Sequence, residues 1–159
     1  PAAALVAPCV LHAELGGATP PLVINVGVSR THRAGHVPGA VWVTRGYLER
    51  AQAAFPHARD IVLASDSEAH ACFAAPEAAA LWPQASVRVL AGGTPAWAAA
   101  GLALEKDMPT ALCPEDDVWY KPYTDVKAKP EDMQGYFNWE FGLVDRIKRD
   151  GSVRFALVK

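Results

Sequence analysis

A short polar loop between two apolar runs carries the side chains best placed to do chemistry. The run at 61–64 predicts a buried strand, and an alanine-rich run from about Ala71 predicts a helix. A strand–loop–helix of this kind directs backbone N–H groups and the positive end of a helix dipole into the loop, which favours an anion. Two of the loop residues are nevertheless acidic. The candidate site residues are Ser65, Asp66, Ser67, Glu68, Ala69 and His70.

Nucleophilic catalysis is one reaction that this loop could support. Ser65 and His70 are a nucleophile and a base at opposite ends of a tight turn, and Asp66 or Glu68 could orient the base. The flanking residues do not form a nucleophile elbow, so hydrolysis is the disfavoured interpretation. Gly92-Gly93 predicts a turn and not a phosphate-binding loop, because no glycine-rich run or Lys-Ser/Thr pair follows it.

Metal binding is a second option that the histidines offer. His32, His36 and His70 could approach one another, with Asp66 as a carboxylate ligand. His12 and His57 stand apart from this group, and we expect both to be solvated surface residues. We expect no metal and no other cofactor.

The three cysteines give little sign of redox or nucleophilic chemistry. Cys9, Cys72 and Cys113 lie far apart and form no CxxC pair, which predicts a reducing compartment such as the cytoplasm. Cys72 falls inside the predicted helix after the loop, so we interpret it as a structural residue and not as a displaced nucleophile. Cys9 and Cys113 lie in terminal or extended segments and are assigned no chemical role.

Apolar runs that alternate with helical segments position the loop. Strands are predicted at residues 21–28, 41–43, 60–65 and 86–93, with a turn-rich loop at 31–40. Helices are predicted at residues 2–15, 47–54, from the loop to about residue 82, and at 94–101. Pro8 should break or kink the first helix, and Thr94 with Pro95 should cap the last one. This alternation indicates βα units and a parallel sheet, an α/β fold.

The character of the chain changes after about Glu105. Residues 106–134 are rich in proline and charge and predict an extended arm, followed by a helix from Pro130 to Gly151 and a strand at 152–158. An apolar stripe lies along the helix, and eight of the fourteen aromatic residues fall between Trp119 and Phe155. We therefore expect this extension to pack on the parent domain or to dock against a neighbouring domain of a longer protein. The stripe consists of Met133, Phe137, Val144 and Ile147.

Composition and charge exclude some classes of function. The chain has 159 residues and a net charge of −2, and no basic cluster indicates nucleic acid or an anionic membrane surface as a partner. No apolar run approaches the roughly 18 residues of a membrane span. The sequence opens with Pro1 and lacks a signal-peptide pattern, so we interpret it as part of a longer protein.

Two motifs resemble the flanking signatures of the rhodanese superfamily, the sulfurtransferases and their relatives. They are GHVPGAVWV at 35–43 and VRVLAGGTPAWAAAGLALE at 87–105, and the likeness covers roughly residues 5–105. The resemblance implies a rhodanese-like domain at 1–105, with a five-stranded parallel sheet covered by helices on both faces, and an extension at 106–159. It also implies that His36 is mainly a structural hydrogen-bonding residue. The tail at 135–155 resembles the end of bacterial proteins in which several such domains follow one another.

The loop departs from the pattern of active family members. In those, the loop begins with a cysteine that carries a persulfide and ends with an arginine, but Ser65 and His70 stand at these positions here. The strand before the first motif usually ends in Asp-Val-Arg, whereas this chain has Asn25-Val26-Gly27, so hydrogen bonds must hold this corner instead. A serine hydroxyl cannot replace an ionisable thiol as a reversible sulfur carrier.

These departures predict a rhodanese-like domain that is catalytically inactive and has a structural, regulatory or docking role. Its expected partners are sibling rhodanese domains of the same polypeptide, with a sulfur-acceptor protein as a further candidate and self-association through the extension as an alternative. The rival interpretation is an active sulfurtransferase that uses a non-standard thiol, or an enzyme that acts on a different anion.

Overall fold

The computed structural model describes residues 3–118 and 129–151. The chain divides into two compact units, Pro1–Val118 and Trp119–Lys159, and each is described by itself. The predicted strand at 152–158 lies outside the described residues. The boundary at residue 105 between a rhodanese-like domain and an extension stays a prediction. The first compact unit of the structure extends further, to Val118.

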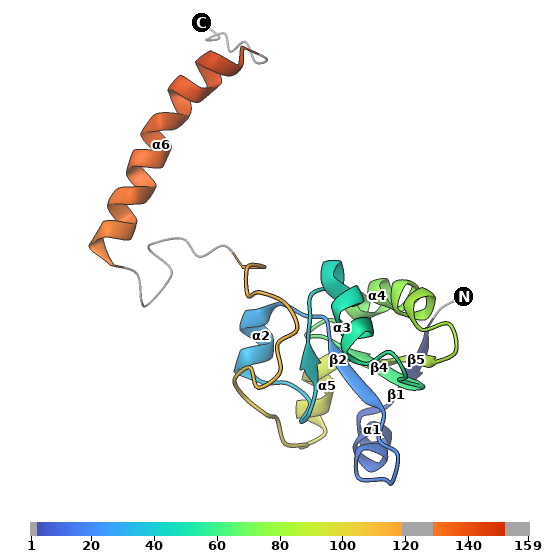
Figure 1. The fold of residues 1–159 in the computed structure, drawn as a ribbon. Coiled ribbons are helices and arrows are strands. Elements are labelled where there is room, and N and C mark those ends of the chain that lie inside the picture. Colours follow the sequence, from blue (N-terminus) through green and yellow to red (C-terminus); the bar gives the residue numbers. More distant parts are fainter. Residues whose placement is uncertain (1–2, 119–128, 152–159) are drawn as a thin grey trace, which may run out of the picture. The chain divides into compact units, whose positions relative to one another are not determined.

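A five-stranded parallel sheet forms the centre of the first unit, as predicted (Figure 1). Its strand order is β1-β5-β4-β2-β3, so β4 lies in the middle. The strands are β1 (Ala4–Val6), β2 (Leu22–Asn25), β3 (Val41–Trp42), β4 (Asp60–Ala64) and β5 (Ser86–Leu90). The helices of this unit are α1 (Pro8–Leu15), α2 (Ser29–Ala34), α3 (Leu48–Ala54), α4 (Glu68–Leu81) and α5 (Gly93–Ala99).

Two segments differ from the sequence-based expectation. The helix expected at 2–15 is interrupted at Pro8, as one of the two expected outcomes, and α1 begins there. The part expected before Pro8 is wrong, because residues 4–6 form β1, which pairs with β5. Ala7 is extended at ψ 148°, as expected before a proline at the first helical position. The loop expected at 31–40 is also partly wrong, because α2 occupies its first residues and ends before Gly35.

The core lies on both faces of the sheet because successive side chains of β4 point in opposite directions. Ile61 and Leu63 belong to the cluster under α3 and α4, and Val62 and Ala64 to the cluster under α1 and α5. The three tryptophans of this unit are buried. They are Trp42, Trp82 and Trp97.

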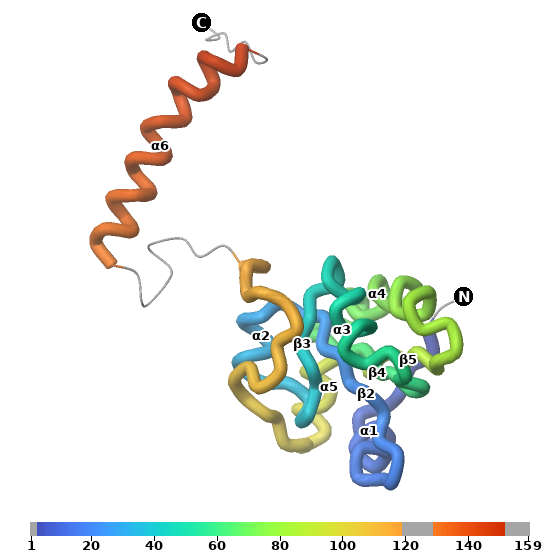
Figure 2. Tube along the Cα trace, in the orientation of Figure 1, coloured from blue at the N-terminus to red at the C-terminus, as the bar shows by residue number. Residues whose placement is uncertain are grey.

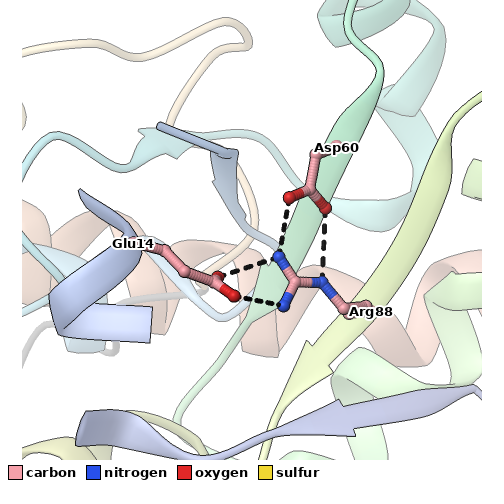
Figure 3. A network of polar contacts seen from close by, with 3 residues as sticks. All are labelled: Glu14, Asp60 and Arg88. Atoms are coloured by element: carbon pink, nitrogen blue, oxygen red, sulfur yellow. Dashed lines mark hydrogen bonds and ion pairs between the residues drawn. The ribbon is translucent and has the colours of Figure 1, made fainter. Parts of the chain in front are cut away.

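An arginine on β5 joins three elements at one face of the sheet. The guanidinium of Arg88 donates two hydrogen bonds to Glu14, at 3.0 and 2.9 Å, and two to Asp60, at 3.2 and 2.7 Å (Figure 3). The hydrogen bonds that Arg88 donates to Glu14 lower the pKa of that carboxyl group below its usual value, and the positive charge of Arg88 is a smaller cause. The network connects α1 to β4 and β5 through forked, charge-assisted contacts.

Residues 102–118 run back along the first unit and cover its β3 edge. Figure 2 shows this segment beside α2 and β3. The N–H of Trp42 donates to the carbonyl of Thr110 at 2.8 Å, and the N–H of Leu112 donates to the carbonyl of Trp42 at 2.9 Å. Asp117 accepts the N–H of Ser29 at the start of α2, at 2.7 Å. The part of the expected arm before residue 119 is therefore a packed strap.

The second unit contains the helix predicted from Pro130, α6 (Pro130–Asp150). Gly151 ends it with φ 65°, in the left-handed region that favours glycine. Large apolar side chains are exposed along it, and they are Phe137, Trp139, Phe141, Val144 and Ile147. Over residues 3–118 and 129–151, no helix combines the length and apolarity that a bilayer crossing needs.

Candidate functional site

The candidate loop begins where the central strand ends. Ser65 follows β4, and Glu68 opens α4, so the loop lies at the carboxyl end of the sheet, where ligands bind in open α/β folds. The carbonyl of Ser65 accepts the N–H of Thr94 at 2.8 Å, and the carboxylate of Glu68 accepts the N–H of Gly92 at 2.6 Å. These two hydrogen bonds connect the loop to the turn before α5 and hold it in place.

The side chain of Ser65 is enclosed within the loop. It is 0% exposed, its hydroxyl donates to Oδ1 of Asp66 at 2.9 Å, and it accepts the N–H of Ser67 at 3.3 Å. The hydroxyl proton is therefore held by the neighbouring carboxylate. His70 lies half-buried on α4, and Asp66 is exposed. This geometry gives the serine–histidine interpretation no support.

The corner after β2 is held by hydrogen bonds, as predicted. The side-chain Oδ1 of Asn25 accepts the N–H of Gly27 at 2.8 Å, and the carbonyl of Gly27 accepts the indole N–H of Trp42 at 2.8 Å. Both contacts are buried. Neutral donors and acceptors therefore hold this corner.

The structure brings His32 and His36 together but does not assemble the four-residue metal site. The two rings stack with centroids 3.6 Å apart, and Nδ1 of His36 lies 2.8 Å from the carbonyl of His32. Across the described parts of the chain, no group of three or more His, Cys, Asp or Glu residues is arranged to hold a metal ion. Burial lowers the pKa of His32 to about 3, with the charges of His36 and Arg33 as smaller causes.

The three cysteines and the two other histidines are either exposed or packed against the hydrophobic core. Cys9 is exposed, Cys72 is half-buried on α4 against the core, and Cys113 is buried, with its Sγ 3.4 Å from the backbone nitrogen of Thr44. His12 and His57 are exposed, as expected.

The family model for the rhodanese-like domain matches residues 11–100, more than half of the chain. The chain belongs to the rhodanese-like family. Its rhodanese-like fold agrees with this match, and the GHVPGA and GGTPAW motifs lie inside the matched range.

Two solved structures are similar to this chain in sequence and fold. The crystal structure of thiosulfate sulfurtransferase from Pseudomonas aeruginosa is 36% identical over the whole of this chain, with a TM-score of 0.89. The chain spans 30% of the length of that protein. The Alr3790 protein from Anabaena is 25% identical over 64% of this chain and 81% of its own, with a TM-score of 0.58. No curated protein matches the sequence.

Gly27 lies beside the side chains of Ser65 and Asp66. A Cβ atom added at Gly27 would lie 3.0 Å from Oδ1 of Asp66, 3.1 Å from Oγ of Ser65 and 3.0 Å from Oδ1 of Asn25. The missing side chain at Gly27 therefore leaves the space that the serine–aspartate pair occupies. This link joins residues about 40 positions apart, and no local pattern in the sequence indicates it.

Sequence reasoning also missed the roles of Gly93 and Thr94. Thr94 was expected to cap α5, but Gly92 is the N-cap, and the backbone N–H of Thr94 binds the loop instead. Gly93 has φ 62°, and a Cβ atom there would lie 2.4 Å from the carbonyl oxygen of Ser65. The paired glycines after β5 were the available signal, because left-handed positions favour glycine.

We predict that Gly93→Ala destabilises the domain much more than Gly101→Ala. Both glycines have positive φ, 62° and 74°, but the added methyl group collides with Ser65 only at position 93. Gly101→Ala should cost about 1–2 kcal/mol, the left-handed penalty alone, and Gly93→Ala should cost more because the loop must also shift. Urea denaturation measures both. Equal losses would contradict the close approach.

We predict that stability rises with pH between about 3 and 6.5 partly because of His32. Its folded pKa of about 3 lies below the ordinary value of 6.5, so the unfolded chain binds the extra proton in this window. The contribution is complete above the unfolded pKa and is lost as pH falls toward the folded one, at up to about 1.4 kcal/mol per pH unit.

Denaturant midpoints measured across that window for wild type and His32→Phe test this prediction. The phenylalanine variant should show a flatter dependence on pH. His57→Gln, at an exposed position, is the control and should retain the wild-type slope. An unchanged slope in His32→Phe would rule out the assignment.

Proposed function

We propose that this rhodanese-like domain does not carry sulfur itself and acts as a structural or docking module beside active rhodanese domains. The observation that carries the proposal is the state of Ser65. Its hydroxyl stands at the mouth of the central strand, fully buried and bonded to Asp66.

Sulfur transfer needs a nucleophile that is ionised near neutral pH and forms a reversible bond to sulfur. A thiolate meets this need, because helix dipoles and nearby N–H groups lower the pKa of a thiol. The hydroxyl of Ser65 does not ionise there without a strong base, and its neighbour Asp66 is a hydrogen-bond acceptor with a negative charge. The fold of the cradle is retained while the group that would do the chemistry is absent from it.

The charge of the loop also disfavours an anionic sulfur donor such as thiosulfate. Asp66 and Glu68 add negative charge close to the start of α4. Two like charges about 4 Å apart repel by about 1 kcal/mol in water and by several times more in a drier site. His70 offers no forked pair of donors in place of the family arginine.

Sibling domains are the partners that this proposal implies. The chain spans 30% of the Pseudomonas thiosulfate sulfurtransferase, a length ratio that leaves room for further domains in a related polypeptide. The exposed apolar side chains of α6 supply a docking surface in the second unit. A cytoplasmic location and a sulfur-acceptor partner belong to the same proposal.

We predict that the wild-type domain gains no sulfur from thiosulfate. Incubation with thiosulfate should leave its intact mass unchanged, and addition of cyanide should give no thiocyanate above the blank. Ser65→Cys combined with Asp66→Asn should gain the mass of one sulfur atom, because the new thiolate attacks the outer sulfur of thiosulfate and sulfite leaves.

Variants at the thiols identify the source of any activity. Product that persists in Ser65→Ala and disappears in Cys72→Ala would overturn the proposal and assign the chemistry to the half-buried thiol of α4. Cys9→Ala, at an exposed position, is the matched control.

We predict that the isolated chain self-associates through α6 when sibling domains are absent. Burial of its apolar side chains is favourable, and Phe141 is 74% exposed. Phe141→Ser should lower the concentration-dependent association measured by sedimentation velocity, and Asn138→Ser on the same helix should not. A wild-type monomer at every concentration, with α6 amides protected from hydrogen exchange, would contradict this prediction.

A further inference from the structure

One side of α6 carries a stripe of exposed apolar side chains. Phe137, Phe141 and Val144 are 41%, 74% and 56% exposed. Their spacing of four and three residues places them within about 60° of one another around the helix axis. The rings of Phe137 and Phe141 stack with their centroids 6.3 Å apart, so the stripe is continuous. None of the residues of α6, all of which the structure describes, is buried. Exposed apolar surface of this kind indicates a contact with another molecule or domain.

The two halves of α6 differ in charge. Residues 130–140 carry three acidic and no basic side chains, whereas residues 141–150 carry three basic and two acidic ones. The first turn is acidic and the last turn contains Lys148 and Arg149, an arrangement that also stabilises a helix through its own dipole. The dipole does not determine where a charge lies around the axis. Lys148 lies about 20° from Phe137 in that direction, and its side chain is 72% exposed. The apolar stripe therefore ends in a positive charge.

This charge pattern fits a second copy of α6 that runs in the opposite direction. An antiparallel neighbour places its acidic first turn beside Lys148, whereas a parallel neighbour would place Lys148 beside the same residue of the other copy. Antiparallel helix dipoles also attract each other, and parallel ones repel. A pair of identical chains related by a twofold axis needs a surface that complements itself. The surface of α6 meets this need, because its acidic half and its basic half belong to the same stripe.

We propose that two copies of the chain pair through α6 in antiparallel orientation, with their apolar stripes in contact and the acidic first turn of each helix beside Lys148 of the other. Phe141 lies next to the midpoint of the 21-residue helix, so the two Phe141 rings meet near the twofold axis. Buried aromatic side chains at the centre of an interface supply much of its binding free energy. The inference rests on the proposed docking role of α6 and names a second copy as the partner, with its orientation.

Charge reversal at Lys148 tests the orientation in the 159-residue chain. Sedimentation equilibrium at low salt gives the dissociation constant of the dimer. Lys148→Glu brings a carboxylate against the acidic first turn at both ends of the pair, so the dissociation constant should rise at least about fivefold. Lys148→Gln, which only removes the charge, should give a smaller loss in the same direction. Most of the difference should disappear at about 1 M salt, where charges are screened. In a parallel pair, Lys148→Glu would leave association equal or stronger.

Arg146→Glu is the matched control. It reverses one charge in the same part of the helix, but Arg146 lies about 180° from Phe137 around the axis. Its dissociation constant should stay within about twofold of wild type. Gln134→Lys combined with Lys148→Glu should restore association, because position 134 is exposed in the acidic half and lies about 60° from Phe137. Circular dichroism checks that each variant keeps its helix content.

The outcomes separate this inference from the proposed function. Equal losses in Lys148→Glu and Arg146→Glu, unchanged or tighter association of Lys148→Glu, or no rescue by Gln134→Lys with helix content retained would overturn the antiparallel assignment. A monomer at every concentration would overturn the second copy as the partner and leave the stripe to a sibling domain. The thiosulfate assay reports on Ser65 and does not depend on association, so a failure there is distinguishable from a failure here.

Discussion

The carbonyl group of Ser65 is the point at which the strands, the loop and α5 are held together. It directly follows β4, accepts the N–H of Thr94, and leaves no room for a side chain at Gly93. Glu68 adds a second contact from the loop to the same turn through Gly92. The position of the loop is therefore set by backbone groups, which remain when the side chains of the loop change. The contact between Ser65 and Thr94 therefore does not depend on which side chain the loop carries at position 65.

Hydrogen bonds within the loop satisfy the hydroxyl group of Ser65. Asp66 accepts the hydroxyl of Ser65, and the absence of a side chain at Gly27 leaves space for both. Gly27, Ser65 and Asp66 are compatible with one another. A longer residue at position 27 would crowd the carboxylate of Asp66. An ionised thiol at position 65 would be repelled by the same carboxylate. The three residues form one packed unit, in which Asp66 accepts an internal hydrogen bond from Ser65 beside Gly27.

The sequence predicts the elements whose signals are local and misses those that depend on distant partners. The apolar runs before Val26 and Ser65 identify β2 and β4, and proline and glycine mark both ends of α6. Residues 4–6 form a strand because they pair with β5. Their alanine-rich composition alone favours a helix, so the sequence gives the wrong element there. The candidate loop is found from its place after the central strand. Its contacts with Gly27 and Gly92 join distant positions, and a single sequence carries no periodic signal for such contacts.

The strap formed by residues 102–118 has a consequence for the isolated domain. β3 has only two residues and ends the sheet, and the strap takes up both backbone groups of Trp42 that face outward. An uncovered edge of this kind offers free donors and acceptors to the edge of another molecule. A fragment cut at residue 105 would keep every residue of the loop and yet expose that edge. Edge-to-edge aggregation, and not loss of the candidate site, would then limit its use as a minimal domain.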